Sequence, residues 1–186
     1  KMIYPIRAYG DPVLRQKCEN VEIFDAEFKE FIDNMYETMD ASDGVGLAAP
    51  QIGKSLRVFL VDSTVFEKEN KKVGIRTAFV NAEILEEEGE EWGFEEGCLS
   101  IPDVREEVQR KPTLKMKFQT IEGEEKIETF EGMTARVIQH EYDHIEGVLF
   151  TDHISSFKRQ LLKGKLSNIS RGKVNVTYRM KFPKRK

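Results

Sequence analysis

The chain has 186 residues, of which 39% are apolar and 33% charged, and it carries a net charge of −4. These values are typical of a globular domain long enough to bury its own hydrophobic core. No apolar run approaches the roughly 20 residues of a membrane-spanning helix, the N-terminus shows no signal peptide, and two cysteines make no disulfide framework. We therefore expect one cytoplasmic domain over residues 1–186, and not a secreted scaffold, a membrane protein or a fibrous protein.

The first half of the chain predicts one helix and two strands. Apolar residues recur at three- and four-residue steps over residues 25–42, which indicates an amphipathic helix that Asp25 can cap. A glycine-rich loop follows over residues 42–53. Apolar, partly β-branched runs then predict strands over residues 56–62 and 77–85.

The second half contains short alternating strands and two helices. The strands are predicted over residues 104–108, 114–121 and 127–130, the helices over 133–145 and 155–170, and an edge strand over 173–181. Hairpin connections without strand–helix alternation predict an α+β fold with antiparallel sheets. We expect these sheets to pack around the helix over 133–145, with further helices near the two ends.

Charge is distributed unevenly along the chain. The last 40 residues contain 11 Lys and Arg but one acidic residue, Asp152, whereas acidic residues concentrate between Glu83 and Glu107. The basic region, with a variable tail from about residue 164 to 186, could contact nucleic acid. A solvated helix and terminus is the simpler interpretation, and we favour it.

The segment His140-Glu141-Tyr142-Asp143-His144 carries the clearest chemical signal. Residues four apart lie on one face of a helix, so both imidazoles can bind one metal ion. Glu141 can then reach a water beside the ion as a general base. Two surface histidines spaced four apart by chance are the alternative, but two of only three histidines in the chain fall in this pattern.

The third metal ligand is less certain from the residues alone. No glutamate follows Glu146, and Phe150 stands where one protease class has a histidine, so two large metalloprotease classes are excluded. Cys98, in a glycine-flanked turn, and His153 remain, with Cys98 slightly favoured. A Cys/His/His set would leave one position open for water, which indicates catalysis.

Three segments together resemble the motifs of the peptide deformylases. They are GVGLAAPQ at 44–51, EGCLS at 96–100 and HEYDH at 140–144, and the resemblance extends over about residues 3–162. It implies a metal-dependent hydrolase that removes the formyl group from the N-terminal formylmethionine of new polypeptides and releases formate. A metal-bound water would attack the formyl carbon, with Glu141 as general acid and base.

The resemblance also assigns roles to residues. Cys98, His140 and His144 would bind one divalent ion, with Fe²⁺ as the native ion and Zn²⁺, Ni²⁺ or Co²⁺ as alternatives. The Gln51 amide and the backbone N–H of Leu99 would stabilise the developing oxyanion. Substrate contacts map onto Gly44, Val45, Gly46, Glu96, Gly97, Arg105, Met133 and Val137.

Three charged residues near this set carry separate expectations. Arg136 departs from the apolar residue that relatives often have, and we expect its guanidinium to lie in solvent at the pocket rim. Asp143 and Arg110 could pair in support of the site, or both could be solvated.

Partners and rival functions follow from the same residues. We expect a monomer that acts on N-formylmethionyl nascent peptides and has no membrane association. Contact with the ribosome through its basic C-terminal region is a hypothesis from charge alone. One rival is a metallopeptidase or amidohydrolase with another acyl substrate, which Cys98 and the glycine-rich loop disfavour. Another is a non-catalytic, peptide-binding zinc protein, which Glu141 and Gln51 disfavour because a structural site needs neither.

Overall fold

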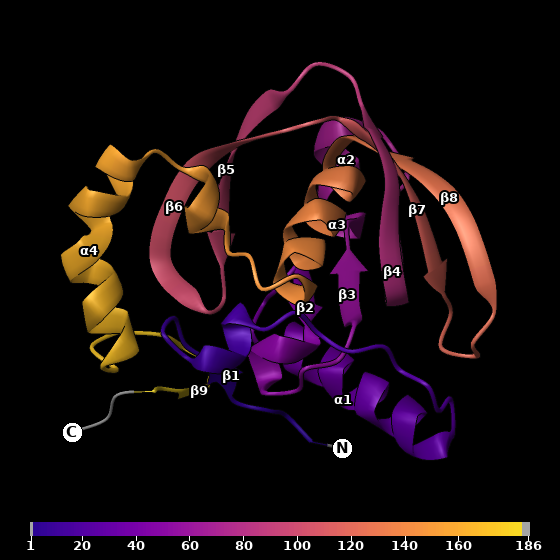
Figure 1. Cartoon of the computed structure of the whole chain (residues 1–186), viewed down its shortest axis with the longest axis horizontal. Coiled ribbons are helices and arrows are strands. Elements are labelled where there is room, and N and C mark those ends of the chain that lie inside the picture. Colours follow the sequence, from indigo (N-terminus) through magenta and orange to yellow (C-terminus); the bar gives the residue numbers. More distant parts are fainter. Residues whose placement is uncertain (1, 184–186) are drawn as a thin grey trace.

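The computed structural model describes residues 2–183, in which two antiparallel sheets flank one helix (Figure 1). The helices are α1 (Ala26–Ala41), α2 (Glu67–Asn70), α3 (Gly132–Ile145) and α4 (Ser156–Ser170). The strands are β1 (Ile6–Arg7), β2 (Gly46–Ala48), β3 (Val58–Asp62), β4 (Arg76–Glu88), β5 (Trp92–Cys98), β6 (Ile101–Arg110), β7 (Thr113–Gln119), β8 (Glu125–Glu131) and β9 (Met180–Lys181). Short 3₁₀ turns are η1 (Pro12–Arg15), η2 (Ala49–Ile52), η3 (Thr64–Phe66) and η4 (Phe150–His153).

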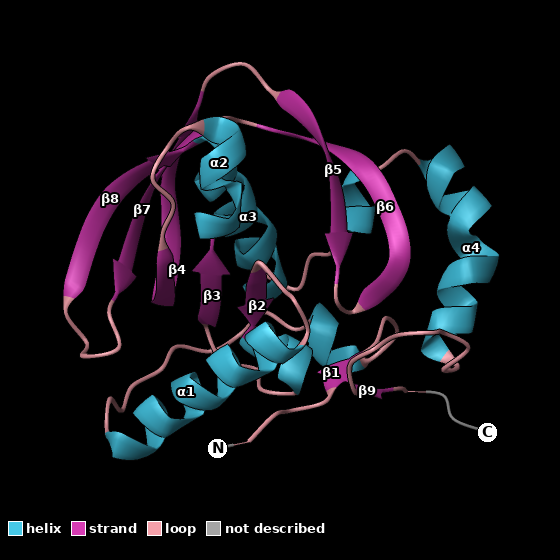
Figure 2. Cartoon of the chain, turned by 180° about the vertical axis from the view of Figure 1, so that it is seen from behind, coloured by secondary structure: helices cyan, strands magenta, loops and turns pink. Residues whose placement is uncertain are grey.

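The larger sheet has the strand order β2-β3-β4-β7-β8, and all neighbouring strands are antiparallel. β5 and β6 form a separate antiparallel pair that curves over the other side of α3 (Figure 2). β1 pairs with β9 in parallel, so the two ends of the described chain meet. This arrangement confirms the predicted α+β class with antiparallel sheets.

α3 lies between the two sheets and is buried on both sides. Its apolar residues Ala135 and Ile138 join the core cluster of the larger sheet, where the rings of Phe59 and Phe79 stack 5.1 Å apart. The opposite side carries polar residues that are also buried, because β5 and β6 cover them. Gly147, just after the helix, has a left-handed conformation with a φ of 76°, which glycine adopts most readily.

The predicted helices are confirmed, and the caps explain where they begin. Asp25 accepts a hydrogen bond from the N–H of Phe28 at 2.9 Å, and Ser155 accepts one from the N–H of Lys158 at 3.2 Å. The predicted strand over residues 173–181 is largely wrong, since only Met180 and Lys181 pair with another strand.

Strand β5 was not anticipated from the sequence. It contains two adjacent glutamates and two glycines, which are poor strand formers. Pairing along its length with β6 holds it in the extended conformation, with one irregularity between Glu96 and Cys98. This strand ends at Cys98, so it positions the thiol that was expected to bind metal.

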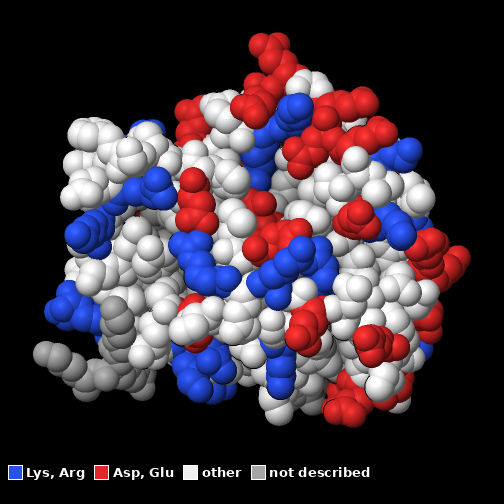
Figure 3. All heavy atoms as spheres, viewed as in Figure 1, with Lys and Arg blue, Asp and Glu red and all other residues white. Residues whose placement is uncertain are grey.

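Charge follows the asymmetry of the sequence. Acidic side chains gather over the connection between β4 and β5 at the top of the view, whereas basic side chains are frequent toward α4 (Figure 3). The four basic residues of α4 are exposed: Lys158, Arg159, Lys163 and Lys165. Among residues 2–183, no helix combines the length and apolar character needed to cross a bilayer.

Candidate active site

Three side chains that could hold a metal ion converge at α3 from two elements. Cys98 lies at the end of β5, and His140 and His144 lie one turn apart on the buried polar side of α3. One ligand atom from each lies within 4.8 Å of the others. The four-residue spacing on a helix therefore brings the two imidazoles together, and the β5–β6 turn brings the thiol to them.

The spacing of these atoms fits a single divalent ion. A sulfur and an imidazole nitrogen sharing a tetrahedral ion lie about 3.6 Å apart, and Cys98 Sγ lies 3.4 Å from His144 Nε2. Burial holds the pKa of His144 well below its ordinary value, which favours the neutral imidazole that binds metal. The chemistry of this donor set suits Zn²⁺, Fe²⁺, Co²⁺ or Ni²⁺.

Glu96 orients the first histidine. Its Oε1 lies 2.9 Å from His140 Nδ1, which leaves Nε2 of that ring available as the metal ligand. Arg110 donates two hydrogen bonds to the same carboxylate, at 2.7 and 3.0 Å. Burial alone would raise the pKa of Glu96, but the hydrogen bonds from His140 and Arg110 outweigh it and hold that pKa well below its usual range.

Glu141 is a buried carboxylate with an unpaired oxygen. Its side chain is 4% exposed, and Oε1 has no hydrogen-bond partner within residues 2–183. Burial raises the pKa of Glu141 to about 7. A Cβ built at Gly46 would lie 2.5 Å from Glu141 Oε2, so the carboxylate occupies space that only a glycine leaves free. A group with these properties can accept and return a proton near neutral pH.

Gln51 is held so that its amide N–H groups face the site. Its Oε1 accepts a hydrogen bond from the N–H of Ala48 at 3.0 Å, which fixes the side-chain orientation. Its Nε2 donates to Ser100 Oγ at 3.1 Å and lies 3.5 Å from Cys98 Sγ. Leu99 directly follows Cys98 in the turn between β5 and β6. Its side chain lies close to Gly44, because a Cβ built at Gly44 would be 3.0 Å from Leu99 Cδ1.

A cleft of about 580 Å³ opens in front of these groups. All eight residues that the sequence assigned to the substrate line it: Gly44, Val45, Gly46, Glu96, Gly97, Arg105, Met133 and Val137. Gln51, Cys98, Leu99, His140 and Glu141 line it as well, whereas His144 is buried and is not part of the lining. The cleft therefore brings the expected substrate residues, Glu141 and two of the three candidate metal ligands to one place.

The expectation for Arg136 is wrong, and of the two alternatives left open for Arg110 the structure shows the pairing with Asp143. Arg136 is 2% exposed, and its guanidinium donates to Glu96 Oε2 at 2.9 Å and to the carbonyl of Trp92 at 2.6 Å. It also lies 4.3 Å above the Trp92 ring. These acceptors on β5 explain why the guanidinium is buried. Arg110 donates to Asp143 at 2.9 Å, so these two residues pair.

Sequence reasoning missed part of the cleft. Phe66, Phe94 and residues 175–178 line it too. The alternation of apolar residues near the end of the chain signals an extended segment, but nothing in that pattern indicates where the segment docks. His153, the other candidate ligand, instead lies 2.8 Å from Asp143 and outside the metal group.

Comparison with known proteins agrees with this geometry. Residues 3–160 match the polypeptide deformylase family. Peptide deformylases of Cytophaga hutchinsonii and Christiangramia forsetii are 54% and 51% identical over all of this chain, and the alignments cover 100% and 98% of those proteins.

Solved structures extend the comparison to the fold. The peptide deformylase of Thermotoga maritima is 44% identical with a TM-score of 0.74, covering 83% of this chain and 99% of its own. That of Legionella pneumophila is 38% identical with a TM-score of 0.79, covering 89% and 94%. By sequence along nearly its whole length and by fold, this chain belongs to the polypeptide deformylase family.

Proposed function

We propose that this chain hydrolyses the formyl group from the N-terminal methionine of newly made polypeptides by the residues assembled in the cleft. Membership of the family makes it a metal-dependent deformylase. The observation that carries the assignment of roles is that the buried Glu141 carboxylate, whose Oε1 has no partner within residues 2–183, lines the same cleft as Cys98 and His140. We propose that the protein acts in the cytoplasm, where nascent chains emerge from the ribosome.

We assign the metal to Cys98, His140 and His144. A divalent ion held there supplies Lewis acidity, lowering the pKa of a nearby water and polarising the formyl carbonyl. The donor set accommodates several first-row ions. We propose Fe²⁺ as the native ion and Zn²⁺, Ni²⁺ or Co²⁺ as substitutes, to be tested by metal analysis of protein purified without oxygen.

Glu141 moves the proton in the proposed reaction. Its carboxylate takes a proton from the attacking water and returns it to the leaving amine. The pKa of about 7 suits both halves of this task, because such a group accepts and releases protons readily near neutrality. Glu96 keeps its charge and orients the His140 ring, so two nearby carboxylates carry different roles.

Gln51 and Leu99 stabilise the oxygen that becomes negative as the water attacks. The Gln51 amide is already oriented by Ala48 and needs no rearrangement during the reaction. The methionine side chain is assigned to the wall formed by Val45, Met133 and Val137, because an unbranched thioether fits an apolar pocket. Gly44 and Gly46 leave room for the peptide backbone to lie along β2.

Three broader proposals accompany this mechanism. The whole chain forms one catalytic domain, supported by the pairing of β1 with β9. It acts as a monomer, supported by the scatter of the exposed large apolar side chains of the described residues over the N-terminal segment, the connections before α1 and β4, η3, β4, β8 and α4. The basic face of α4 contacts the ribosome, supported by the exposure of its lysines and arginine. Light scattering at the mass of 21.5 kDa tests the second proposal.

Substrate discrimination tests the function. We expect formate release from formyl-Met-Ala and no acetate release from acetyl-Met-Ala, since the metal and Gln51 must both reach a small acyl group. A blocked peptide with an internal Met-Ala bond should remain intact. Cleavage of that internal bond without formate release would instead support the metallopeptidase, and binding without any hydrolysis would support the peptide-binding zinc protein.

A further inference from the structure

The last described segment runs from the end of α4 back to the N-terminal strand. Gly172 ends the helix region with a φ of 81°, and the chain then extends to β9. The N–H of Ile6 donates to the carbonyl of Arg179 at 2.9 Å, and the N–H of Ala8 donates to that of Lys181 at 3.0 Å. These bonds fix the far end of the segment on a buried strand.

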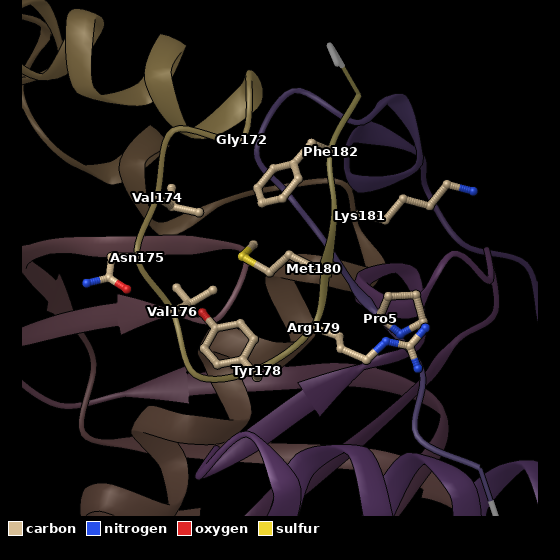
Figure 4. A pocket seen from close by; sticks show the side chains of 10 residues that line it. All are labelled: Pro5, Gly172, Val174, Asn175, Val176, Tyr178, Arg179, Met180, Lys181 and Phe182. Atoms are coloured by element: carbon tan, nitrogen blue, oxygen red, sulfur yellow. The ribbon is translucent and has the colours of Figure 1, made fainter. Parts of the chain in front are cut away.

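Side chains alternate along this segment. Figure 4 shows Val174, Val176 and Met180 projecting into the space that the loop encloses, whereas Asn175 points out of it. The burial pattern agrees, because even-numbered residues from 174 to 180 are half-buried and odd-numbered ones are exposed. The segment is therefore an ordered, extended strap, although it forms little sheet.

This strap borders the active-site cleft. Asn175, Val176, Thr177 and Tyr178 line the same cleft as His140 and Glu141, and we call residues 175–178 the C-terminal wall. The match to the family ends at residue 160, so the wall lies beyond the part of the chain that the family match covers. Pro102, Asp103 and Arg105 of β6 line the cleft as well.

A buried contact joins the wall to the reacting end of the cleft. The Tyr178 hydroxyl donates to the carbonyl of Leu99 at 2.7 Å. Both side chains pack on the core cluster formed by α1, β2 and β3. The wall is thus attached to the turn that follows the metal ligand Cys98, and its position is set by the same backbone.

The size of the cleft indicates what this wall is for. A volume of about 580 Å³ accommodates a ligand larger than one residue. In the proposed function, formylmethionine occupies the part of the cleft next to Cys98 and His140 and the wall formed by Val45, Met133 and Val137. The remaining lining offers an amide, a hydroxyl and an apolar side chain from the C-terminal wall, which are groups that can contact a peptide backbone and small side chains.

Resting on the proposed function, we propose that residues 175–178 are specificity-determining and bind the substrate residues that follow formylmethionine. Tyr178 holds the wall in place through Leu99, whereas Asn175 and Thr177 contact the peptide. The wall therefore raises the rate for longer formylated peptides and contributes nothing for the shortest.

The test compares two substrates and two variants. If the proposal holds, formyl-Met-Ala ends before the wall and formyl-Met-Ala-Ala-Ser reaches it. The double variant Asn175→Ala/Thr177→Ala removes two exposed side chains of the wall without touching the core. The control is Arg179→Ala, an exposed residue of the same strap that does not line the cleft.

We expect the double variant to lose at least about five-fold in kcat/KM for the tetrapeptide, because about five-fold is the factor for the loss of one neutral hydrogen bond. Its kcat/KM for the dipeptide should stay within about two-fold, and Arg179→Ala should match the wild type on both. An unchanged tetrapeptide-to-dipeptide ratio in the double variant would overturn the proposal, as would an equal loss on both substrates. No formate from either substrate with the wild-type enzyme would overturn the proposed function and this inference with it.

Discussion

Replacing Gly46 with alanine places a methyl group against the Glu141 carboxylate. A Cβ built at Gly46 lies 2.5 Å from Glu141 Oε2 and 2.8 Å from its Cδ. Gly46 is buried in β2 and pairs with Val61 of β3, so its backbone has little room to retreat. The carboxylate must therefore move by about 1 Å to restore an ordinary contact of about 3.5 Å.

A shift of this size has two measurable consequences. Misplacing a catalytic group by about 1 Å costs about 100-fold in rate, so we expect kcat/KM for formyl-Met-Ala to fall by about that factor. Overpacking a core costs about 1–3 kcal/mol, which corresponds to about 3–9 °C in Tm for a domain of this size. Formate release at equal metal content and thermal melting measure the two effects separately.

The matched control is Gly164→Ala in α4. A Cβ built at Gly164 meets no atom within 4 Å, and the helix should gain about 0.5–1 kcal/mol from the lower entropy of its unfolded chain. Formate release should be unchanged. Wild-type activity in Gly46→Ala would refute the reasoning, because it would mean that the Glu141 carboxylate is not confined by β2 or that its position does not matter.

Three further predictions concern charge and metal. Because the pKa of Glu96 is lowered in the folded state, its carboxylate stabilises the fold fully at neutral pH, and that contribution is lost as pH falls below about 4. Glu96→Gln should lower the free energy of unfolding by about 3–5 kcal/mol at pH 7. Urea unfolding should show this difference from wild type shrinking toward pH 3, and a difference independent of pH would contradict the prediction. Chelation should abolish formate release, and Fe²⁺ or Zn²⁺ added to the stripped protein should restore it, whereas activity that survives complete metal removal would exclude the proposed role of Cys98. The charge reversal Arg159→Glu/Lys163→Glu, on one exposed face of α4, should weaken cosedimentation with ribosomes and leave formyl-Met-Ala hydrolysis unchanged; equal cosedimentation of both proteins would count against ribosome contact.

Point substitutions test ribosome contact better than truncation does. Removing residues after Gly172 would delete β9 and the C-terminal wall together with the basic tail. A loss of activity would then report on the cleft and not on the ribosome. Lys184, Arg185 and Lys186, which complete the basic tail, lie outside the described residues.

The local sequence pattern was enough to predict the buried helix that carries His140 and His144. The four-residue spacing of His140 and His144 determines that both rings face one way once the helix forms, and the apolar residues before them predict that it is buried. Four strands of the larger sheet, β3, β4, β7 and β8, were also predicted from apolar runs or alternation, whereas β2 lies in the segment predicted as a glycine-rich loop. Their bounds differ by a few residues at the ends.

Features that depend on distant partners could not be predicted. Arg136 is buried because Glu96 and the Trp92 carbonyl accept its hydrogen bonds, and both lie at least 40 residues away in sequence. The rule that arginine extends toward solvent fails where such acceptors are buried together. The strap after α4 was predicted as a strand, but its course is set by β1 and by the Leu99 carbonyl.

The central claim is that Glu141 transfers the proton in a metal-dependent deformylation. Glu141→Gln keeps the shape of the side chain but cannot accept a proton, so it isolates this role. With metal content quantified in both proteins, we predict a fall in kcat for formyl-Met-Ala of about 10²–10⁴ and no loss of bound metal. Wild-type formate release from a fully metal-loaded Glu141→Gln enzyme would contradict the account.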